Sequence, residues 1–262
     1  MMLPAIINPH PGILAYNAFQ AVAITGIHKG ECENPTPYSK FALTSSAKRG
    51  SSPMVPSKMG MLIIYVPATI VAFIYQCILP LFRDDIVPTI AGWLLLAHFA
   101  KRDLEVLFLH KYSGQTELNA SRTIGFYYAL TTFMIAIVAS VEPSVKETQI
   151  GLALFAVGAL GNFYHHYLLA QLRSSSNKDS SKKYVAPKRG LFEYAAAPHY
   201  MFELIGWLGI AVASHQLTGY LTFVSMTMYL SARSFLQNQW NKDKFGEKEW
   251  PSSRKNMVPF VY

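Results

Sequence analysis

Apolar segments about as long as a membrane-crossing helix dominate this chain of 262 residues. A helix needs about 20 apolar residues to cross the hydrocarbon core of a bilayer. Backbone N–H and C=O groups cannot stay unpaired in lipid, so such segments fold as helices. The predicted spans are residues 6–27, 59–80, 86–109, 123–140, 149–170, 199–215 and 217–233. The expected fold class is therefore all-α, a bundle of seven transmembrane helices.

The composition agrees with a membrane protein. Hydrophobic residues make up 51% of the chain and charged residues only 15%, whereas soluble domains carry about 25% charged residues. With no repeat and no separate soluble region, residues 1–262 are expected to form a single membrane domain. The first segment has no basic residue before Lys29 and no clear cleavage site, so we interpret it as a retained helix. The third carries Lys101, Arg102 and Asp103 midway, so its second half should follow the interface or line a cavity.

The basic residues predict the orientation. Of the 23 Lys and Arg residues, 21 fall on one side of the predicted spans, and only Arg83 and Lys146 fall on the other. Cytoplasmic loops carry the excess of basic residues, so the C-terminus is expected in the cytoplasm and the N-terminus in the opposite compartment. The polar connections are residues 28–58 and 171–190. Because the charges flank apolar spans and match no nucleic-acid motif, we expect no nucleic-acid partner.

One polar cluster lies in the fifth span. Asn162, His166 and Arg173 are spaced i, i+4 and i+11, so they share one face of a helix. A buried polar stripe that ends in arginine suits a ligand with a phosphate at its cytoplasmic end. Interhelical hydrogen bonding is an alternative. The adjacent His165 and His166 also permit a metal site, but a di-iron oxygenase needs further such clusters, so we expect no metal.

A second cluster begins the sixth span. Pro198 suits the first turn of a helix, and His199 and Glu203 follow one turn apart. A carboxylate within a span needs a partner, and Glu203 could bind a carboxamide or hydroxyl of a ligand. A protonated or His-paired structural glutamate is the alternative. The zinc-protease pattern is absent, and Cys32 and Cys77 are expected to be packing residues.

The tail from Arg233 to Tyr262 combines basic residues with an apolar end. Arg254, Lys255 and the apolar run from Met257 to Phe260 indicate a segment that docks back on the membrane domain, although a solvated basic tail is the alternative. No G-x-G-x-x-G follows a predicted strand. Any dinucleotide must therefore bind without a Rossmann domain.

Three strings carry a family resemblance: GNFYHHYLLAQLR (161–173), GLFEYAAAPHYMFELIGWLG (190–209) and SSRKNMVPFVY (252–262). Together they resemble the steroid 5α-reductase (3-oxo-5-alpha-steroid 4-dehydrogenase) family, especially its plant members. The resemblance is strongest over residues 150–262 and is traceable from residue 59. It implies a seven-spanning enzyme of the endoplasmic reticulum membrane, with cytoplasmic loops and the C-terminal tail closing over an NADPH site carried mostly by residues 150–262.

The resemblance also implies which residues bind NADPH. They are Asn162, His166, Arg173, Tyr184, His199, Glu203, Arg233 and Arg254. Arg173 and Arg254 would suit phosphates, as arginine forks do, and Glu203 would suit the nicotinamide carboxamide. His199 and His166 stand where steroid-reducing members typically have Asn and Asp.

The positions implied for substrate differ from the steroid-reducing pattern. Those members hydrogen-bond the steroid ketone through a Glu in the second span and a Tyr in the third, where this chain has Tyr65 and Phe99. Residues 101–113 resemble the very-long-chain enoyl-CoA reductase branch, and Tyr200 matches its catalytic tyrosine. We therefore expect Tyr65 and Tyr200 as the candidate catalytic donors to a substrate carbonyl, since a phenol can donate a hydrogen bond and a proton.

The expected activity is NADPH-dependent reduction of a C=C bond conjugated to a carbonyl in a lipid, by an oxidoreductase acting on CH–CH groups. A Δ4-3-ketosteroid is the first candidate substrate, and a trans-2-enoyl-CoA of fatty-acid elongation is the alternative. A membrane methyltransferase that uses S-adenosylmethionine and a membrane protein without enzymatic activity are two less favoured interpretations.

Overall fold

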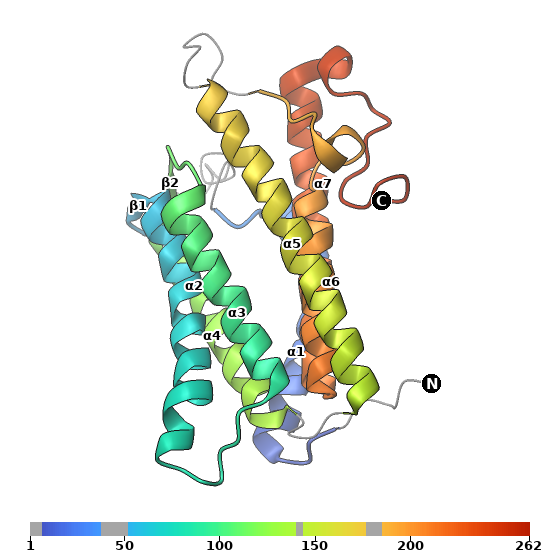
Figure 1. The fold of residues 1–262 in the computed structure, drawn as a ribbon. Coiled ribbons are helices and arrows are strands. Elements are labelled where there is room, and N and C mark those ends of the chain that lie inside the picture. The colour runs from blue at the N-terminus through green and yellow to red at the C-terminus, as the bar shows by residue number, and fades with distance from the viewer. Residues whose placement is uncertain (1–6, 38–51, 140–143, 177–184) are drawn as a thin grey trace.

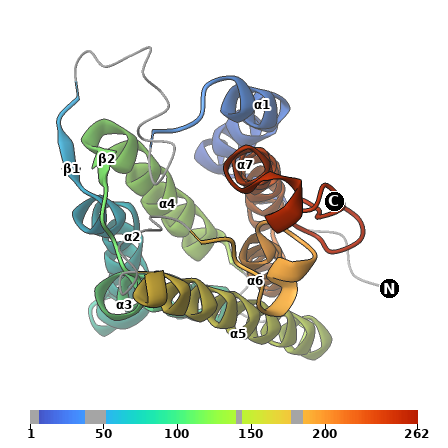
Figure 2. The same ribbon diagram turned by 90° about the horizontal axis from the view of Figure 1, so that it is seen from above.

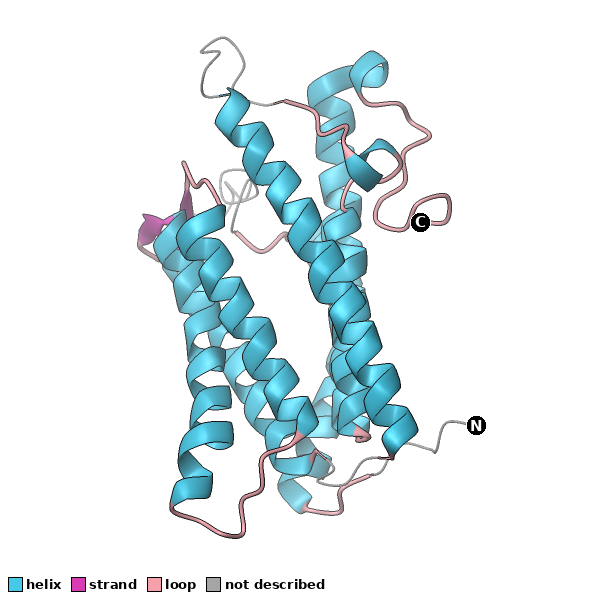
Figure 3. Ribbon diagram, viewed as in Figure 1, coloured by secondary structure: helices cyan, strands magenta, loops and turns pink. Residues whose placement is uncertain are grey.

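The computed structural model describes residues 7–37, 52–139, 144–176 and 185–262. Helices make up most of this part of the chain (Figure 3). The α-helices in it are α1 (Pro11–Glu33), α2 (Ser57–Phe73), α3 (Ile90–Leu104), α4 (Leu118–Val138), α5 (Val145–Ser176), α6 (Pro198–Ser214) and α7 (Leu217–Glu249).

Each of the seven predicted segments falls on one of these helices, which confirms the helical fold. Several helices run beyond the apolar residues: α1 extends to Glu33, α5 to Ser176 and α7 to Glu249. The predicted loops 28–58 and 171–190 therefore begin too early. Polar residues such as Lys, Gln and Glu are good helix formers, so a helix can continue past its apolar part.

Two helical segments are long and apolar enough to cross a membrane. They are Ser57–Leu81, with a mean hydropathy of 2.2, and Leu118–Val138, with a mean hydropathy of 1.2. The first joins α2 to a π-helix, η3 (Ile74–Ile78), and a 3₁₀ turn, η4 (Leu79–Leu81). Length and composition thus support membrane insertion for these two segments of the described chain.

A short two-stranded ladder departs from the expected all-α fold. Strand β1 (Met54–Pro56) pairs antiparallel with β2 (Gln115–Glu117), with Val55 opposite Thr116. Each strand leads directly into a helix, so the ladder ties the start of α2 to the start of α4.

The helices form two neighbouring groups. Helices α2, α3 and α4 lie together, while α6, α7 and α1 lie beyond them and α5 runs along one side (Figures 1 and 2). Helices α5 and α6 are packed with their backbones close together. A Cβ atom on Gly158 would lie 2.3 Å from the Gly206 nitrogen, and one on Gly209 would lie 2.7 Å from the Gly151 oxygen. Small residues permit such close approach between helices.

The tail after α7 returns to the bundle, as the sequence predicts. Lys255 forms a parallel bridge with Ala195, and its carbonyl accepts a hydrogen bond from the Ala196 nitrogen at 2.8 Å. The Asn256 carbonyl accepts another from Ala197 at 2.9 Å. The tail is therefore fixed to the segment that precedes α6, which also includes a short 3₁₀ helix, η6 (Gly190–Glu193).

Candidate functional site

Charged and polar side chains gather in the interior where α2, α3, α5 and α6 meet. We call this group the buried polar cluster. Its members are Tyr65, Lys101, Arg102, Glu105, Asn162 and His166. Glu105, which directly follows α3, lies three positions after Arg102 and four after Lys101, and residues at these spacings are neighbours on a helix.

Arg102 is at the centre of the buried polar cluster. Its Nη2 donates to the Tyr65 hydroxyl at 2.7 Å, and its Nη1 donates to Glu105 Oε2 at 2.6 Å. The same Nη1 lies 3.0 Å from His166 Nδ1. Arg102 is only 7% exposed, and burying a charge is costly unless it is paired and hydrogen-bonded. These contacts satisfy that condition.

Glu105 and Lys101 extend the cluster from α3 to α5 and α6. Glu105 Oε1 lies 2.7 Å from Lys101 Nζ, so one carboxylate faces two cations. Lys101 Nζ donates to Asn162 Oδ1 at 2.7 Å, and Asn162 Nδ2 donates to the His199 carbonyl at 2.9 Å. A continuous set of polar contacts therefore links the second, third, fifth and sixth helices.

A π-helix, η5 (Glu105–Leu109), forms the end of the third helix. Its i→i+5 hydrogen bond runs from the His110 nitrogen to the Glu105 carbonyl at 2.8 Å. Isolated π-helical turns occur frequently at functional sites. This turn brings the His110 ring to 4.9 Å from the His166 ring. Burial and the positive charge of Arg102 lower the pKa of His110 to about 3, so it is neutral at physiological pH.

Glu105, His110 and His166 each offer a possible metal-ligand atom, and these atoms lie within 4.8 Å of one another. The Arg102 guanidinium, however, already contacts the Glu105 and His166 atoms at 2.6 and 3.0 Å. A cation of this chain therefore occupies the position between two of the three ligands.

Helix α6 adds two buried residues, His199 and Glu203, and His199 Nδ1 has no hydrogen-bond partner among the described residues. The His199 ring lies 5.4 Å from the His166 ring and 4.3 Å from the Tyr200 ring. Glu203 interacts electrostatically with Tyr65 and Arg102. No hydrogen bond joins His199 to Glu203 among the described contacts, so the alternative pairing of these two side chains is not formed.

The remaining predicted residues lie outside this cluster. Arg173 donates to the Lys111 carbonyl at 2.7 Å, and Arg254 donates to the Pro187 carbonyl at 3.1 Å. Arg233 is paired with Glu31 of α1 at 2.9 Å. Tyr184 lies outside the described residues.

His165, next to His166, faces away from the buried polar cluster. Its Nδ1 donates to the Gly161 carbonyl at 2.7 Å, and its Nε2 accepts from the Leu191 nitrogen at 3.4 Å. Both ring nitrogens are engaged, and the ring stacks on Phe202 at 5.2 Å. His165 therefore packs helices together, which fits the interhelical alternative for this histidine.

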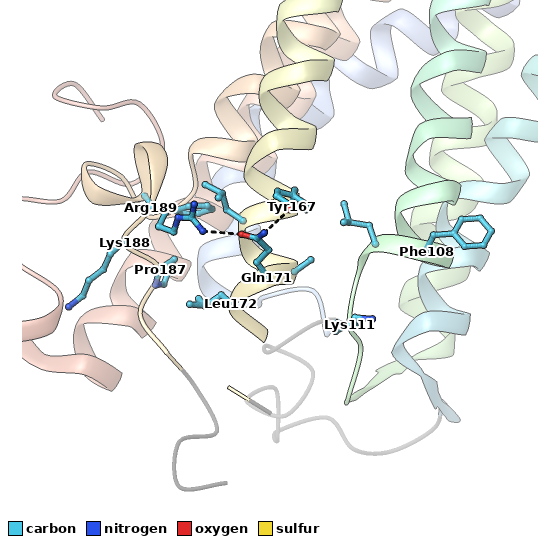
Figure 4. A pocket seen from close by; sticks show the side chains of 12 residues that line it. Phe108, Lys111, Tyr167, Gln171, Leu172, Pro187, Lys188 and Arg189 are labelled. Carbon is cyan, nitrogen blue, oxygen red and sulfur yellow. Dashed lines mark hydrogen bonds between the residues drawn. The ribbon is translucent and has the colours of Figure 1, made fainter. Parts of the chain in front are cut away.

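A cavity of about 620 Å³ lies between the end of η5, the last part of α5 and residues 187–192 (Figure 4). Gln171 bridges one wall, because its Nε2 donates to the Tyr167 hydroxyl at 2.6 Å and its Oε1 accepts from Arg189 at 3.0 Å. Apolar lining is supplied by Phe108, Leu172 and Phe192, and cations by Lys111, Lys188 and Arg189. This cavity suits an amphiphilic ligand that carries phosphate.

A second cavity of about 320 Å³ lies between α7 and the tail, with Lys242, Arg254 and Lys255 in its lining. Arg254 stacks on Trp250 with its guanidinium carbon 4.1 Å from the ring centre, and its buried Nε has no hydrogen-bond partner among the described residues. Because Arg254 donates to the Pro187 carbonyl and Pro187 lines the first cavity, the two cationic cavities flank the same segment.

The predicted site residues do not include Arg102, Glu105 and His110, which the structure places in or beside the buried polar cluster. The available signal was the group of charges within an apolar span, since ionisable residues there mark functional sites. The spacing of Lys101, Arg102 and Glu105 also predicts mutual contact on one face.

These features define a helical protein with two candidate membrane spans and a buried cluster of charged side chains. A family model described as 3-oxo-5-alpha-steroid 4-dehydrogenase matches residues 121–262, more than half of the chain. The protein belongs to this steroid 5α-reductase family, whose members are oxidoreductases that act on CH–CH groups with NADPH.

Individual relatives represent both branches of the family. A very-long-chain enoyl-CoA reductase of Dictyostelium discoideum is 24% identical over 63% of this chain and 55% of its own length. The 3-oxo-5-alpha-steroid 4-dehydrogenase 1 of Rattus norvegicus is 37% identical over 42% of this chain and 40% of its own. Steroid 5-alpha-reductase DET2 of Solanum lycopersicum is 34% identical over 43% and 42%. The chain thus spans about half the length of the curated relatives it matches.

Proposed function

We propose that this protein reduces a C=C bond conjugated to a carbonyl in a lipid, with NADPH, and that a Δ4-3-ketosteroid is the first candidate substrate. The observation that carries the proposal is the contact between Tyr65 and Arg102 within the buried polar cluster. A candidate carbonyl donor thereby lies among residues that the family resemblance assigns to NADPH, Asn162 and His166.

The chain offers groups that fit the cofactor. His199 Nδ1 is buried without a hydrogen-bond partner among the described residues, and the buried Glu203 carboxylate would accept from the nicotinamide carboxamide. Arg254 and Arg173 lie in or beside the two cationic cavities, where they would bind phosphates. Arg233 already has a carboxylate partner in Glu31, so its assignment to the cofactor rests on the resemblance alone.

The chemistry that NADPH supplies when bound is a hydride for the β-carbon of the conjugated system. Negative charge then develops on the carbonyl oxygen, and the phenol of Tyr65 or Tyr200 donates a hydrogen bond to it. One such donor is worth about 2.7–4 kcal/mol in the transition state. The buried position of Tyr65, 7% exposed, keeps water away from this step.

We also propose that all seven helices cross the endoplasmic reticulum membrane, with the C-terminus in the cytoplasm and the tail closing over the cofactor. The 21-to-2 division of basic residues supports this orientation. Large apolar side chains project from the outer surface, including Phe126, Leu160 and Val22 at 70%, 71% and 72% exposure. Such side chains suit contact with lipid.

A trans-2-enoyl-CoA is the second candidate substrate. Two observations favour it: the relative named as an enoyl-CoA reductase aligns with 63% of this chain, and Tyr200 lies beside His199 next to the buried polar cluster. Membership of an oxidoreductase family disfavours both a methyltransferase and a protein without enzymatic activity. A greater sequence similarity to the plant members stays a prediction, because a rat relative is as similar as a tomato one.

The test is an assay of purified protein with NADPH against a Δ4-3-ketosteroid and, separately, a long-chain trans-2-enoyl-CoA. Oxidation of NADPH coupled to a saturated product is the expected result. NADPH binding without reduction of either substrate would contradict the proposed activity, and a protein that does not bind NADPH would contradict the cofactor.

A further inference from the structure

Tyr65 and Arg102 are joined by a hydrogen bond whose direction is fixed by chemistry. A guanidinium has donors and no acceptor, so the 2.7 Å contact uses a lone pair of the Tyr65 oxygen. The phenol therefore keeps its own proton, and that proton cannot point toward Arg102. No other described residue forms a hydrogen bond with this hydroxyl.

The guanidinium itself has little freedom to move. Its Nη1 is held by Glu105 at 2.6 Å and lies 3.0 Å from His166, while Nη2 reaches Tyr65. The guanidinium carbon also lies 4.8 Å from the centre of the Tyr65 ring. Because the guanidinium is a rigid planar fork, fixing one nitrogen on Glu105 fixes the direction in which the other meets the phenol.

A positive charge next to the phenol oxygen also strengthens that phenol as a donor. Hydrogen bonds in a chain polarise one another when each group accepts one and donates the next, and here Arg102 donates to the Tyr65 oxygen while the phenol proton is left to donate onward. Lys101 pairs with the other oxygen of Glu105 at 2.7 Å. The carboxylate therefore stays in place to hold the arginine.

We infer that Arg102 is a positioning residue that holds the Tyr65 phenol with its proton directed at the substrate carbonyl, an assignment that rests on the proposed function. It makes Tyr65, of the two candidate tyrosines, the donor to the developing oxyanion. Arg102 acts through Tyr65 and needs no contact with substrate.

The test compares Arg102→Gln, Arg102→Lys, Tyr65→Phe and the double variant Tyr65→Phe/Arg102→Gln, with kcat, KM and NADPH affinity measured for each. Arg102→Lys keeps the charge, but a single ammonium cannot hold Glu105 and Tyr65 as a fork does. If Arg102→Gln yields too little folded protein, Arg102→Lys takes its place in the comparison. Glu147→Gln is the matched control, because Glu147 is a buried carboxylate paired with His215 at 3.0 Å, roughly 20 Å along α5 from Asn162.

We expect Arg102→Gln to lower kcat roughly 10²-fold with unchanged NADPH affinity, and Arg102→Lys to lower it roughly 10-fold. The double variant should be no slower than Tyr65→Phe, because Arg102 has nothing to position once the hydroxyl is gone. The control should keep the wild-type kcat. A merely structural role for Arg102 would lower the amount of folded protein and would add to the effect of Tyr65→Phe.

Two outcomes overturn the inference and leave the proposed function intact. They are fully multiplicative losses in the double variant, and a loss in Arg102→Lys confined to NADPH affinity. A wild-type protein that reduces neither substrate would instead overturn the proposed function and the inference together.

Discussion

The helix pair α2–α3, before residue 121, and the helix pair α5–α6, after it, are packed in different ways. Helices α5 and α6 meet through glycines as well as the Asn162–His199 hydrogen bond, with space at Gly158 for no more than a hydrogen atom. Helices α2 and α3 meet through polar side chains, including a hydrogen bond of 2.5 Å from Thr69 to Asp103 and the contact of Tyr65 with Arg102. The family model matches only the later part, residues 121–262.

This difference indicates that the two parts of the chain have different roles, one in binding the cofactor and the other in binding the substrate. The matched part holds Asn162, His166 and Glu203, which we assign to the cofactor, on a closely packed pair of helices. The earlier part contributes Tyr65, which we assign to the substrate carbonyl, and Arg102, which we assign to the positioning of Tyr65. A shared cofactor with variable substrates is the outcome expected when one part of a fold is constant and the other differs.

Tyr65→Phe should produce the largest change. Loss of a main donor to the developing oxyanion costs ~10²–10³ in kcat, with a smaller effect on cofactor affinity. The phenylalanine keeps the ring and its packing against Tyr128 at 6.0 Å. Steady-state kinetics on each accepted substrate is the measurement, and Tyr16→Phe, which removes a hydroxyl bonded to Thr131 at 2.8 Å, is the control. If Tyr200→Phe alone abolished turnover, the result would favour a trans-2-enoyl-CoA as the substrate. Full turnover in both variants would make Lys101 and His199 the next donors to test.

Gly158→Ala tests the close packing of α5 on α6. The new methyl carbon would lie 2.3 Å from the Gly206 nitrogen, so the helices must separate, at a cost of about 1–3 kcal/mol. Gly26→Ala is the matched control, because nothing lies within 4 Å of the new atom and removing a helical glycine stabilises by roughly 0.5–1 kcal/mol. The measurement is the thermal midpoint of the purified proteins. Equal midpoints for the two variants would show that the α5–α6 contact is not a close-packed frame.

Glu203→Gln should weaken NADPH binding roughly 10-fold, because a charge-assisted hydrogen bond to the nicotinamide carboxamide becomes a neutral one. Direct titration of the membrane-extracted protein with NADPH measures this. Glu147→Gln, at a buried carboxylate of the neighbouring helix, should bind normally. Normal NADPH binding by Glu203→Gln would assign this carboxylate a structural role instead.

Arg173→Gln should reduce the preference for NADPH over NADH about 10-fold, because the arginine and the basic residues beside it are assigned to the extra phosphate of NADPH. The ratio of kcat/KM for the two cofactors is the measurement. Arg83→Gln, an exposed arginine paired with Asp85 at 2.7 Å, should leave the ratio unchanged. A wild-type enzyme with equal efficiency on both cofactors would already contradict this prediction.

The smallest expected effect is the absence of a modification. Asn119, Ala120 and Ser121 form a glycosylation sequon that the predicted orientation places in the cytoplasm, so it should remain unmodified. In addition, Ser121 is fully buried and its hydroxyl donates to the Glu117 carbonyl at 3.1 Å. An endoglycosidase-sensitive mass that disappears in Asn119→Gln would reverse the orientation of every helix.

The sequence predicted the helices well because their apolar lengths are a local property. The face shared by Asn162 and His166 was also predictable, since both lie on one helix within a single turn. The pairing of Arg233 with Glu31 was not, because 202 residues separate the two side chains. Strands β1 and β2 have three residues each, too few for an alternating pattern to be recognised.

The charges at residues 101–105 show a different limit. We expected the second half of the third span to follow the interface or to line a cavity, because isolated charges are costly in lipid. Phe108 and Leu109 of this half do line the larger cavity. The charges themselves are buried instead, because Arg102 pairs with Glu105 and also contacts Tyr65 and His166. A hydropathy pattern treats each charged residue separately, so it cannot show that side chains of neighbouring helices pair with these charges.

The π-helical turn of η5 carries one more residue per turn than the α-helix that precedes it. Such a turn behaves as a single-residue insertion that the helix has absorbed. Deleting one residue between Glu105 and Leu109 would leave a regular α-helical turn, in which the donor to the Glu105 carbonyl lies four positions later and not five. His110 and Lys111 would then have to reach His166 and the larger cavity from a helix that is one residue shorter. Length in this segment is therefore as constrained as residue identity, and related chains that differ here by one position should differ in what they bind.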